Sequence, residues 1–380
     1  MKKKCIAVFV AMLLVLTGAA VPEPVRAEEV LSLSAKSAVL MDASTGRILY
    51  ASNPDEQLAM ASTTKIMTAL LTLEEAEKEN KAVKITREMV QVEGSSMGLK
   101  EGNILSLWDL AAGMLAVSGN DAANSAAIAI SGSKEGFAEK MNCKARELGM
   151  EHTNFVTPSG LDDEEHYSTA RDMAILARNA LENPEFASIV SQPTIRVTYQ
   201  SPEQSCVFTN HNKLLRMYEG CIGVKTGFTK KAGRCLVSAA ERNGVRLVAV
   251  TLNAPDDWND HMAMFDYGFS KMTAYTPDES ACRISVPVVG GETGTVFVKG
   301  EAGTRVSLLK EEEASLSRKV ELPRFLYAGL KKGEIVGRVV YCAGNVEIAS
   351  IPLKTETAVA FVKREKSLWE KICDWFAGLF

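Results

Sequence analysis

The sequence predicts an α+β fold, in which an antiparallel sheet packs with a cluster of helices and a small all-β domain follows. Two observations lead to this prediction. Between residues 30 and 275, strand patterns at both ends of the segment enclose a block of helical patterns. Between residues 279 and 361, short alternating strands are separated by glycines and charged turns, and we find no catalytic constellation there.

Length and charge limit the possible functions. The chain has 380 residues, which is enough for two domains, and 46% of them are hydrophobic. The formal net charge is −4, so the chain has no general electrostatic attraction to nucleic acid, and we expect no nucleic-acid partner.

Residues 1–27 have the parts of a secretory signal peptide. A basic start at residues 2–4 precedes an apolar run at 5–20, which is too short to span a bilayer comfortably. Val25-Arg26-Ala27 supplies small residues at the expected cleavage positions. We therefore expect an exported protein, with an uncleaved membrane anchor as the alternative.

Each element of the domain at 30–275 follows from a local pattern. Strands are expected at 37–42 and 47–51, around turn residues 43–46. Helices are expected at 62–78, 107–117, 122–130, 134–148 and 169–181, with Thr169 as a cap and a long loop at 154–168. Strands follow at 196–199, 206–209, 221–227, 233–240 and 246–252, the last two around an Asn243-Gly244 turn, before a closing helix at 258–272.

The first candidate site lies at the start of the helix 62–78. Ser62 and Lys65 are three residues apart, so their side chains are neighbours on a helix. A serine hydroxyl needs a base, and the apolar residues after Lys65 favour the neutral amine that can act as one. Taken alone, this pattern is also explained by Ser62 as an N-cap.

Two other serines are weaker candidates. Ser131 and Lys134 repeat the Ser-x-x-Lys spacing, but Gly132 between them predicts loop or cap positions. Ser96 lies in a G-x-S-x-G pattern, which requires a strand before it and a helix after it. A turn follows instead, so we interpret residues 94–98 as a glycine-rich surface loop.

Two further motifs strengthen the case for Ser62. Ser118-Gly-Asn120 lies at a predicted helix–helix turn, and Lys225-Thr226-Gly227 lies on a predicted strand. Together the three motifs form the set S-x-x-K, S-x-N and K-T-G in the expected order and context.

This set suits acyl transfer. Ser62 would attack a carbonyl, Lys65 would accept its proton, and Ser118 would relay a proton to the leaving amine. Lys225 would hold the Ser118 hydroxyl, and Asn120 would contact both Lys65 and a substrate amide. The backbone N–H groups of Ser62 and Phe228 would form an oxyanion hole, while Lys225 and Thr226 would bind a terminal carboxylate and Gly227 would let substrate lie along the strand edge.

With these motifs the chain resembles the low-molecular-mass penicillin-binding proteins, the serine D-alanyl-D-alanine carboxypeptidases. Residues 154–161 (NFVTPSGL), 167–173 (YSTARDM) and 264–269 (MFDYGF) also resemble family segments. The resemblance implies the catalytic fold shared by β-lactamases and penicillin-binding transpeptidases. It also implies removal of the terminal D-alanine from peptidoglycan pentapeptide stems and acylation by β-lactams.

One departure concerns carboxylate binding. Many members of this family carry an arginine shortly before the closing helix, whereas residues 253–260 (NAPDDWND) contain none. Arg234, on the strand predicted at 233–240 that follows the Lys225-Thr226-Gly227 strand, is a candidate to replace it.

Three alternatives stay open at this point. A DD-endopeptidase would use the same chemistry. A β-lactamase would need a glutamate to hydrolyse the acyl-enzyme, for which Glu164 and Glu165 lie in the right general loop. A non-catalytic muropeptide-binding protein is the third, although the intact motifs argue against it.

Cysteine and histidine spacing predicts no metal site and no cofactor. The eight cysteines include no C-x-x-C pair, and the four histidines lack metal-ligand spacing. We expect most cysteines to be buried thiols, and the pairs Cys206–Cys221 and Cys221–Cys235 stay open as disulfides.

The C-terminal segment 364–380 is predicted to be an amphipathic helix. It is too short and too charged to span a membrane, and its aromatic face suits the bilayer surface. We expect it to hold the protein peripherally at the extracytoplasmic face of the membrane, with docking on the β domain as the alternative. The apolar stripe contains Leu368, Ile372, Trp375, Phe376 and Leu379, with Glu370, Lys371 and Asp374 opposite.

Overall fold

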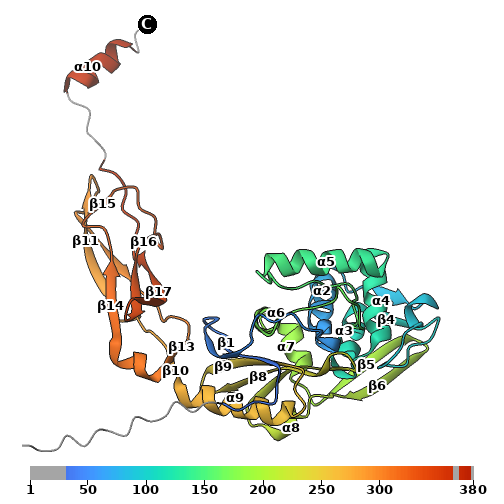
Figure 1. The fold of residues 1–380 in the computed structure, drawn as a ribbon. Coiled ribbons are helices and arrows are strands. Elements are labelled where there is room, and N and C mark those ends of the chain that lie inside the picture. The colour runs from blue at the N-terminus through green and yellow to red at the C-terminus, as the bar shows by residue number, and fades with distance from the viewer. Residues whose placement is uncertain (1–30, 363–367, 378–380) are drawn as a thin grey trace, which may run out of the picture. The chain divides into compact units, whose positions relative to one another are not determined.

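The structure is a computed structural model that describes residues 31–362 and 368–377. The predicted signal peptide lies outside the described residues, as do residues 364–367 and 378–380 of the predicted C-terminal helix and the side chains of Glu370, Asp374 and Phe376. The described chain contains antiparallel sheets, a helical cluster and a C-terminal all-β part, which confirms the α+β prediction (Figure 1).

A five-stranded antiparallel sheet forms the centre of the catalytic part. Its strands are β1 (Ser37–Asp42), β2 (Ile48–Ser52), β7 (Cys221–Thr229), β8 (Gly233–Arg242) and β9 (Val245–Leu252), in the order β2-β1-β9-β8-β7. Strand β7 is therefore an edge strand. The predicted turn at Asn243-Gly244 joins β8 to β9, and positive φ angles of 51° and 80° fit it to a tight hairpin.

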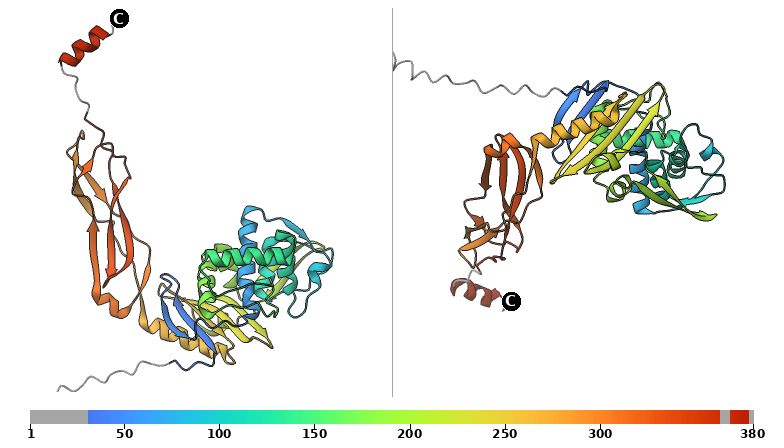
Figure 2. Two further views of the ribbon diagram at one scale, coloured as in Figure 1. Left: turned by 45° about the horizontal axis from the view of Figure 1, so that its top comes forward. Right: turned by 90° about the horizontal axis from the view of Figure 1, so that it is seen from below.

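Helices cover both faces of this sheet (Figures 1 and 2). On one face, α9 (Asp257–Lys271) packs closely because Gly268 has no side chain, and a Cβ there would lie 2.5 Å from Leu247 Cδ1. The helical cluster on the other face shares one large apolar core with the sheet. Its helices are α2 (Lys65–Lys78), α3 (Leu107–Ala116), α4 (Asn120–Ser131), α5 (Lys134–Glu147), α6 (Ala170–Ala180) and α7 (Pro184–Val190).

A second sheet lies beside the helical cluster. The strands predicted at 196–199 and 206–209 are longer, as β5 (Thr194–Ser201) and β6 (Glu203–Thr209), and they form a hairpin. They join β3 (Ala82–Lys84) and β4 (Ile104–Ser106) rather than the central sheet. A short helix, α8 (Leu214–Met217), leads from β6 toward β7.

The C-terminal all-β part has an apolar core of its own. Its six-stranded sheet has the order β14-β16-β17-β12-β11-β15. The strands are β11 (Arg283–Val289), β12 (Thr295–Lys299), β14 (Leu316–Glu321), β15 (Leu326–Tyr327), β16 (Ile335–Ala343) and β17 (Val346–Thr355). Helix α10 (Leu368–Ala377) is the last described element.

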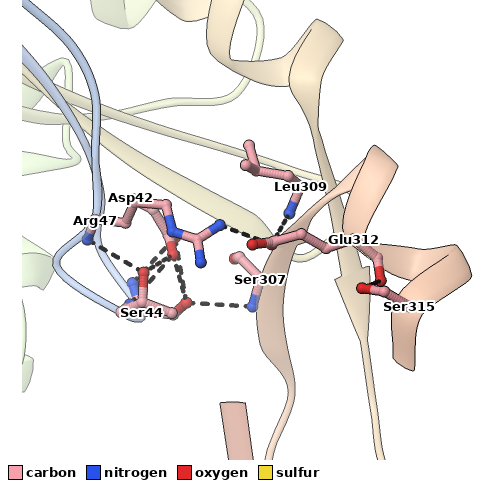
Figure 3. Close-up of polar contacts among 8 residues, drawn as sticks. Asp42, Ser44, Arg47, Ser307, Leu309, Glu312 and Ser315 are labelled. Carbon is pink, nitrogen blue, oxygen red and sulfur yellow. Dashed lines mark hydrogen bonds and ion pairs between the residues drawn. The ribbon is translucent and has the colours of Figure 1, made fainter. Parts of the chain in front are cut away.

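Polar contacts join the first hairpin to the β-rich part (Figure 3). Arg47 forms an ion pair of 2.7 Å with Glu312, and the backbone N–H of Ser307 donates to Ser44 Oγ. Beside these contacts, β10 (Met272–Tyr275), which directly follows α9, pairs with β13 (Val306–Leu309). A short two-stranded sheet and an ion pair therefore connect the two parts.

Among the described residues, neither disulfide considered above is present, because six cysteines are free thiols: Cys143, Cys206, Cys221, Cys235, Cys282 and Cys342. Of these six only Cys235 is buried, so the expectation that most cysteines are buried is wrong for them.

Candidate active site

The turn that carries Ser62 differs from the predicted helix start. Residues Ala61–Thr64 form a 3-10 turn, η1, and α2 begins at Lys65. Ala61 has a positive φ of 49°, an uncommon backbone conformation for a residue with a side chain, directly before Ser62. Lys65 Nζ lies 3.0 Å from Ser62 Oγ, so the predicted pair of neighbouring side chains is present.

Three chain segments hold the Lys65 amine. Besides Ser62 Oγ, Nζ lies 2.6 Å from Asn120 Oδ1 at the start of α4 and 2.6 Å from the carbonyl oxygen of Ser159 in the loop 154–168. The amide of Asn120 is oriented by its Nδ2, which donates to the carbonyl of Glu93 at 2.6 Å. The side chain of Lys65 has no solvent exposure.

This arrangement matches a neutral amine. Burial, together with the positive charge of Lys225, lowers the pKa of Lys65 well below the usual value of a lysine. A neutral amine has two N–H bonds and one lone pair. The Asn120 and Ser159 oxygens can only accept, so they take both N–H bonds, and the lone pair is left for the Ser62 hydroxyl proton. Lys65 is therefore placed to act as a general base toward Ser62.

The S-x-N motif meets this pair at the turn between α3 and α4. Ser118 is nearly buried and has a positive φ of 62°, which turns the chain sharply before Asn120. The prediction that Asn120 contacts Lys65 agrees with the structure. Both polar atoms of the Asn120 side chain are engaged by protein groups, so a substrate amide would have to share or displace one of them.

Lys225 is also buried, and burial lowers its pKa to about 7. Its Nζ donates to the carbonyl of Thr226 at 2.8 Å. Among the described residues it makes no hydrogen bond to Ser118, in contrast to the expectation that it holds that hydroxyl. Lys225 instead contributes positive potential that favours neutral Lys65.

The loop at 154–168 contributes more than its composition predicted. Thr68 donates to the carbonyl of Pro158, which holds the loop against α2. Gly160 has a φ of 79°, and a Cβ there would lie 2.1 Å from the Ala61 carbonyl oxygen. Only glycine fits this approach without moving the turn before Ser62. No sequence signal other than the family resemblance of 154–161 points to this role.

His166 connects the same loop to the Ser62 turn. Burial lowers the pKa of His166 to about 4, so its imidazole is neutral at ordinary pH. Nδ1 accepts hydrogen bonds from the backbone N–H groups of Val156 and Thr157, which places the proton on Nε2. Nε2 therefore donates to Thr64 Oγ1 at 2.8 Å, and Thr64 donates to the Ala61 carbonyl.

A cleft of about 320 Å³ opens beside these groups. Ser62, Ser118 and the outer edge residues Thr226, Gly227 and Phe228 of β7 line it. Arg234, the candidate for carboxylate binding, also lines the cleft. The remaining lining residues were not identified by the sequence motifs: Ser95, His211, Lys213, Asp257 and Trp258. The Gly94–Gly98 segment, predicted as a surface loop, thus forms part of the rim through Ser95.

Arg234 lies opposite Phe228 in the β7–β8 pairing, and its side chain is 41% exposed. Its Nε and one terminal nitrogen both donate to Oδ1 of Asp257, at 3.0 and 2.6 Å. The guanidinium carbon is 5.4 Å from the centre of the Trp258 ring. The structure thus places an oriented arginine at one end of the cleft.

The rejected candidates lie outside this arrangement. Ser131 ends α4 and Lys134 begins α5, so the two side chains belong to different helices. The cap positions between them are Gly132, which is in the left-handed region, and Ser133, rather than Ser131 and Lys134 as predicted. The Ser96 hydroxyl donates to Asp121 at 2.6 Å. Glu164 and Glu165 are exposed, and no described carboxylate lines the cleft apart from Asp257, which is paired with Arg234.

Comparison with known proteins decides the family. Residues 24–256 match the family model described as D-alanyl-D-alanine carboxypeptidase, and residues 269–360 match the C-terminal domain of penicillin-binding protein 5. The chain belongs to the D-alanyl-D-alanine carboxypeptidase family. It is thus a serine hydrolase of the carboxypeptidase type and a penicillin-binding protein, as the three motifs predicted.

Relatives match over nearly the whole chain. The D-alanyl-D-alanine carboxypeptidase DacF of Bacillus subtilis is 32% identical, over 90% of this chain and 91% of the relative. The crystal structure of penicillin-binding protein 5 from Haemophilus influenzae matches with a TM-score of 0.68 and 32% identity, over 87% of this chain and 98% of that one. A D-alanyl-D-alanine endopeptidase of Pseudomonas aeruginosa is 34% identical over 57% of this chain and 71% of the relative.

Proposed function

We propose that this carboxypeptidase removes the terminal D-alanine from peptidoglycan pentapeptide stems through an acyl-enzyme on Ser62. The observation that carries the proposal is the Lys65 amine, whose two N–H bonds are engaged by Asn120 and Ser159 and whose lone pair faces Ser62. Ser62 Oγ attacks the penultimate carbonyl as its proton moves to Lys65. Ser118, which lines the same cleft, gives its proton to the departing D-alanine amine and is reprotonated by the proton that Lys65 accepted, so Lys65 is neutral again when water hydrolyses the ester and frees Ser62.

The edge of β7 is the proposed binding surface for the stem peptide. A Cβ on Gly227 would lie 3.0 Å from the Ser62 backbone nitrogen, so β7 passes very close to the nucleophile. The N–H groups of Ser62 and Phe228 are assigned to the oxyanion hole, and the substrate extends along Lys225, Thr226 and Gly227 as an added strand.

Arg234 is the proposed partner of the substrate carboxylate, together with Thr226. Its guanidinium reaches the cleft while Asp257 fixes two of its N–H bonds, which leaves the remaining donors for a ligand. This would compensate for the absence of an arginine at residues 253–260.

We further propose export by the predicted signal peptide and peripheral attachment to the outer side of the membrane through the C-terminal helix. In α10, Leu368, Trp369 and Trp375 are largely exposed, which supports an apolar surface available for lipid. None of the helices in the described residues combines the length and apolar character required to cross a bilayer.

The test is intact-protein mass spectrometry during incubation with penicillin, combined with D-alanine release from a stem pentapeptide. We expect one long-lived adduct on Ser62 and release of one D-alanine per peptide. Ser62→Ala should lose both, whereas Ser131→Ala, which removes the serine of the other Ser-x-x-Lys sequence, should retain both. An active Ser62→Ala variant would refute the proposal.

The same experiment separates the alternatives. An adduct that disappears within seconds while penicillin is consumed indicates a β-lactamase. Faster cleavage of a cross-linked peptide dimer than of the pentapeptide indicates an endopeptidase. The similarity to the P. aeruginosa endopeptidase is the reason to test this alternative. A chain that binds stem peptide but forms no adduct indicates a binding protein.

A further inference from the structure

A patch of exposed apolar side chains lies at one end of the all-β part. It consists of Val289, Phe325, Tyr327, Phe361 and Val362, whose exposed fractions range from 46% to 68%. The backbone holds these residues together. Val289 pairs with Tyr327 between β11 and β15, Phe361 bridges to Gly291, and the N–H of Val362 donates to the Gly290 carbonyl.

Strand alternation places the aromatic members on one face. Leu326, Ala328 and Leu330 pack into or against the core, so Phe325, Tyr327 and Gly329 point to the other side. The Phe325 and Tyr327 rings are in edge contact, with centroids 5.5 Å apart. A Cβ on Gly329 would lie 2.7 Å from the Phe361 ring, so this ring covers Gly329 on the same outer face. The patch is therefore continuous, unlike scattered surface residues.

Basic residues flank the patch. Arg324 directly precedes Phe325, and Lys331 and Lys332 directly follow Leu330; all three are exposed. The sequence KREK at 363–366, immediately after Val362, adds three more basic residues and one acidic residue. Two exposed carboxylates, Glu292 and Glu334, also lie near the patch, so its surroundings are mixed in charge with an excess of basic residues. Aromatic side chains with such a basic excess nearby suit an anionic lipid surface, where rings enter the headgroup region and cations meet phosphates.

The length of the chain limits how far the patch can lie from the proposed anchor. Five residues, 363–367, separate Val362 from Leu368, the first residue of α10. Six fully extended peptide steps span at most about 22 Å. When α10 lies in the bilayer surface, Val362 is therefore within about 22 Å of it, and Val362 is a member of the patch.

We propose that this patch is a second membrane contact, which rests on the anionic bilayer surface beside the C-terminal helix. The inference relies on the proposed attachment through α10. It gives the all-β part a direct role in membrane binding, in addition to its connection to the catalytic part.

The test measures partition of the chain from residue 28 onto vesicles of phosphatidylethanolamine and phosphatidylglycerol in equal amounts. We expect the triple variant F325S/Y327S/F361S to bind at least about tenfold more weakly than the parent. The matched control V207S/M217S/V346S removes three exposed apolar side chains elsewhere and should bind like the parent. D-alanine release in solution should be unchanged in both variants, which separates this result from a failure of the catalytic proposal.

A second measurement locates the contact directly. In a chain with W369F and W375F, a tryptophan introduced as Y327W should be quenched by brominated lipids, whereas V346W should not. Parent-like partition of the patch variant, or an unquenched Y327W on a bound chain, would overturn the proposal. A change from dimer to monomer in the patch variant without any change in partition would instead assign the patch to a second copy of the chain. If L368E/W369E/I372E binds like the parent, the anchor proposal fails separately.

Discussion

Lys65 Nζ lies 3.0 Å from Ser62 Oγ in a pocket that excludes solvent from the amine. The carbonyl of Ser159 and the amide of Asn120 take up the N–H bonds of this amine, so one orientation remains for its lone pair. The nucleophile and its base are thus arranged before substrate arrives.

The base role of Lys65 predicts the result of a charge-preserving substitution. Lys65→Arg keeps a cation but cannot accept a proton at ordinary pH, so we expect penicillin acylation to slow by about 10²–10⁴-fold. Stopped-flow acylation, followed by mass spectrometry, measures this rate. A loss of less than tenfold, with the fold retained by circular dichroism, would mean that another group accepts the proton.

The electrostatic interaction between the two buried lysines, Lys65 and Lys225, predicts a shift in the pH dependence of the acylation rate when Lys225 is replaced. The charge of Lys225 lowers the pKa of Lys65, so replacing Lys225 with Met should raise that pKa. Because neutral Lys65 is the active form, the acid limb of the acylation rate should move to higher pH in Lys225→Met. A Lys213→Met variant removes an exposed cation that also lines the cleft and should shift the limb less. An unmoved limb would show that Lys225 does not influence the base.

Burial of Lys225 also predicts a pH-dependent stability. Its pKa of about 7 in the folded state lies below the usual 10.5, so between these values the unfolded chain binds more protons and stability rises with pH. Lys225→Met has no buried charge to accommodate at pH 7. Its free energy of unfolding should therefore exceed that of the parent by up to a few kcal/mol at pH 7, with a smaller difference at pH 10. Urea unfolding at both pH values measures the difference, with exposed Lys84→Met as a control. A difference that is independent of pH would contradict the explanation.

The approach of Gly160 to Ala61 predicts a remote effect on the nucleophile. Gly160→Ala would place a Cβ 2.1 Å from the Ala61 carbonyl oxygen, so the Ser62 turn must move, and acylation should fall more than about tenfold. Gly132→Ala is a matched control, since its φ is also 79° but no atom lies within 4 Å of a Cβ there. Both variants should lose about 1–3 kcal/mol of stability from the positive φ. Equal acylation rates would show that the loop does not position Ser62.

Carboxylate recognition by Arg234 predicts substrate-dependent kinetics. Arg234→Ala should lower kcat/KM for a stem peptide with a free C-terminal carboxylate by about 10–100-fold. The same peptide with a C-terminal amide should react slowly with the parent and change little in the variant. Arg234→Lys should recover part of the loss because it restores charge but not the planar donor pair. Equal losses on both peptides would assign Arg234 a structural role in holding Asp257.

Local sequence patterns predicted much of the fold because apolar periodicity and turn-forming residues act directly on strands, helices and turns. Alternating apolar residues identified β8 and β9, and Asn243-Gly244 identified their turn. The motifs also identified the Ser62, Lys65 and Asn120 contacts, which depend on short spacing across a 3-10 turn and on a helix start.

Contacts between distant segments could not be predicted in this way. The roles of Ser159 and His166 depend on how the loop 154–168 packs on α2, and backbone carbonyls leave no signal in a sequence. The interaction of Lys225 with its own neighbouring carbonyl, rather than with Ser118, depends on side-chain direction within a buried strand. The separate four-stranded sheet depends on pairing between β4 and β5, which are far apart in the chain.

Because Ser62, Asn120 and Ser159 reach Lys65 from three separate segments, reactivity toward penicillin is a measure of correct assembly. A polypeptide in which any of these segments is displaced has an unpaired or misdirected amine and an unreactive serine. A fluorescent β-lactam would therefore count molecules with an assembled site rather than total polypeptide. The labelled fraction, measured at successive times during refolding or secretion, would give the rate at which the native active site forms.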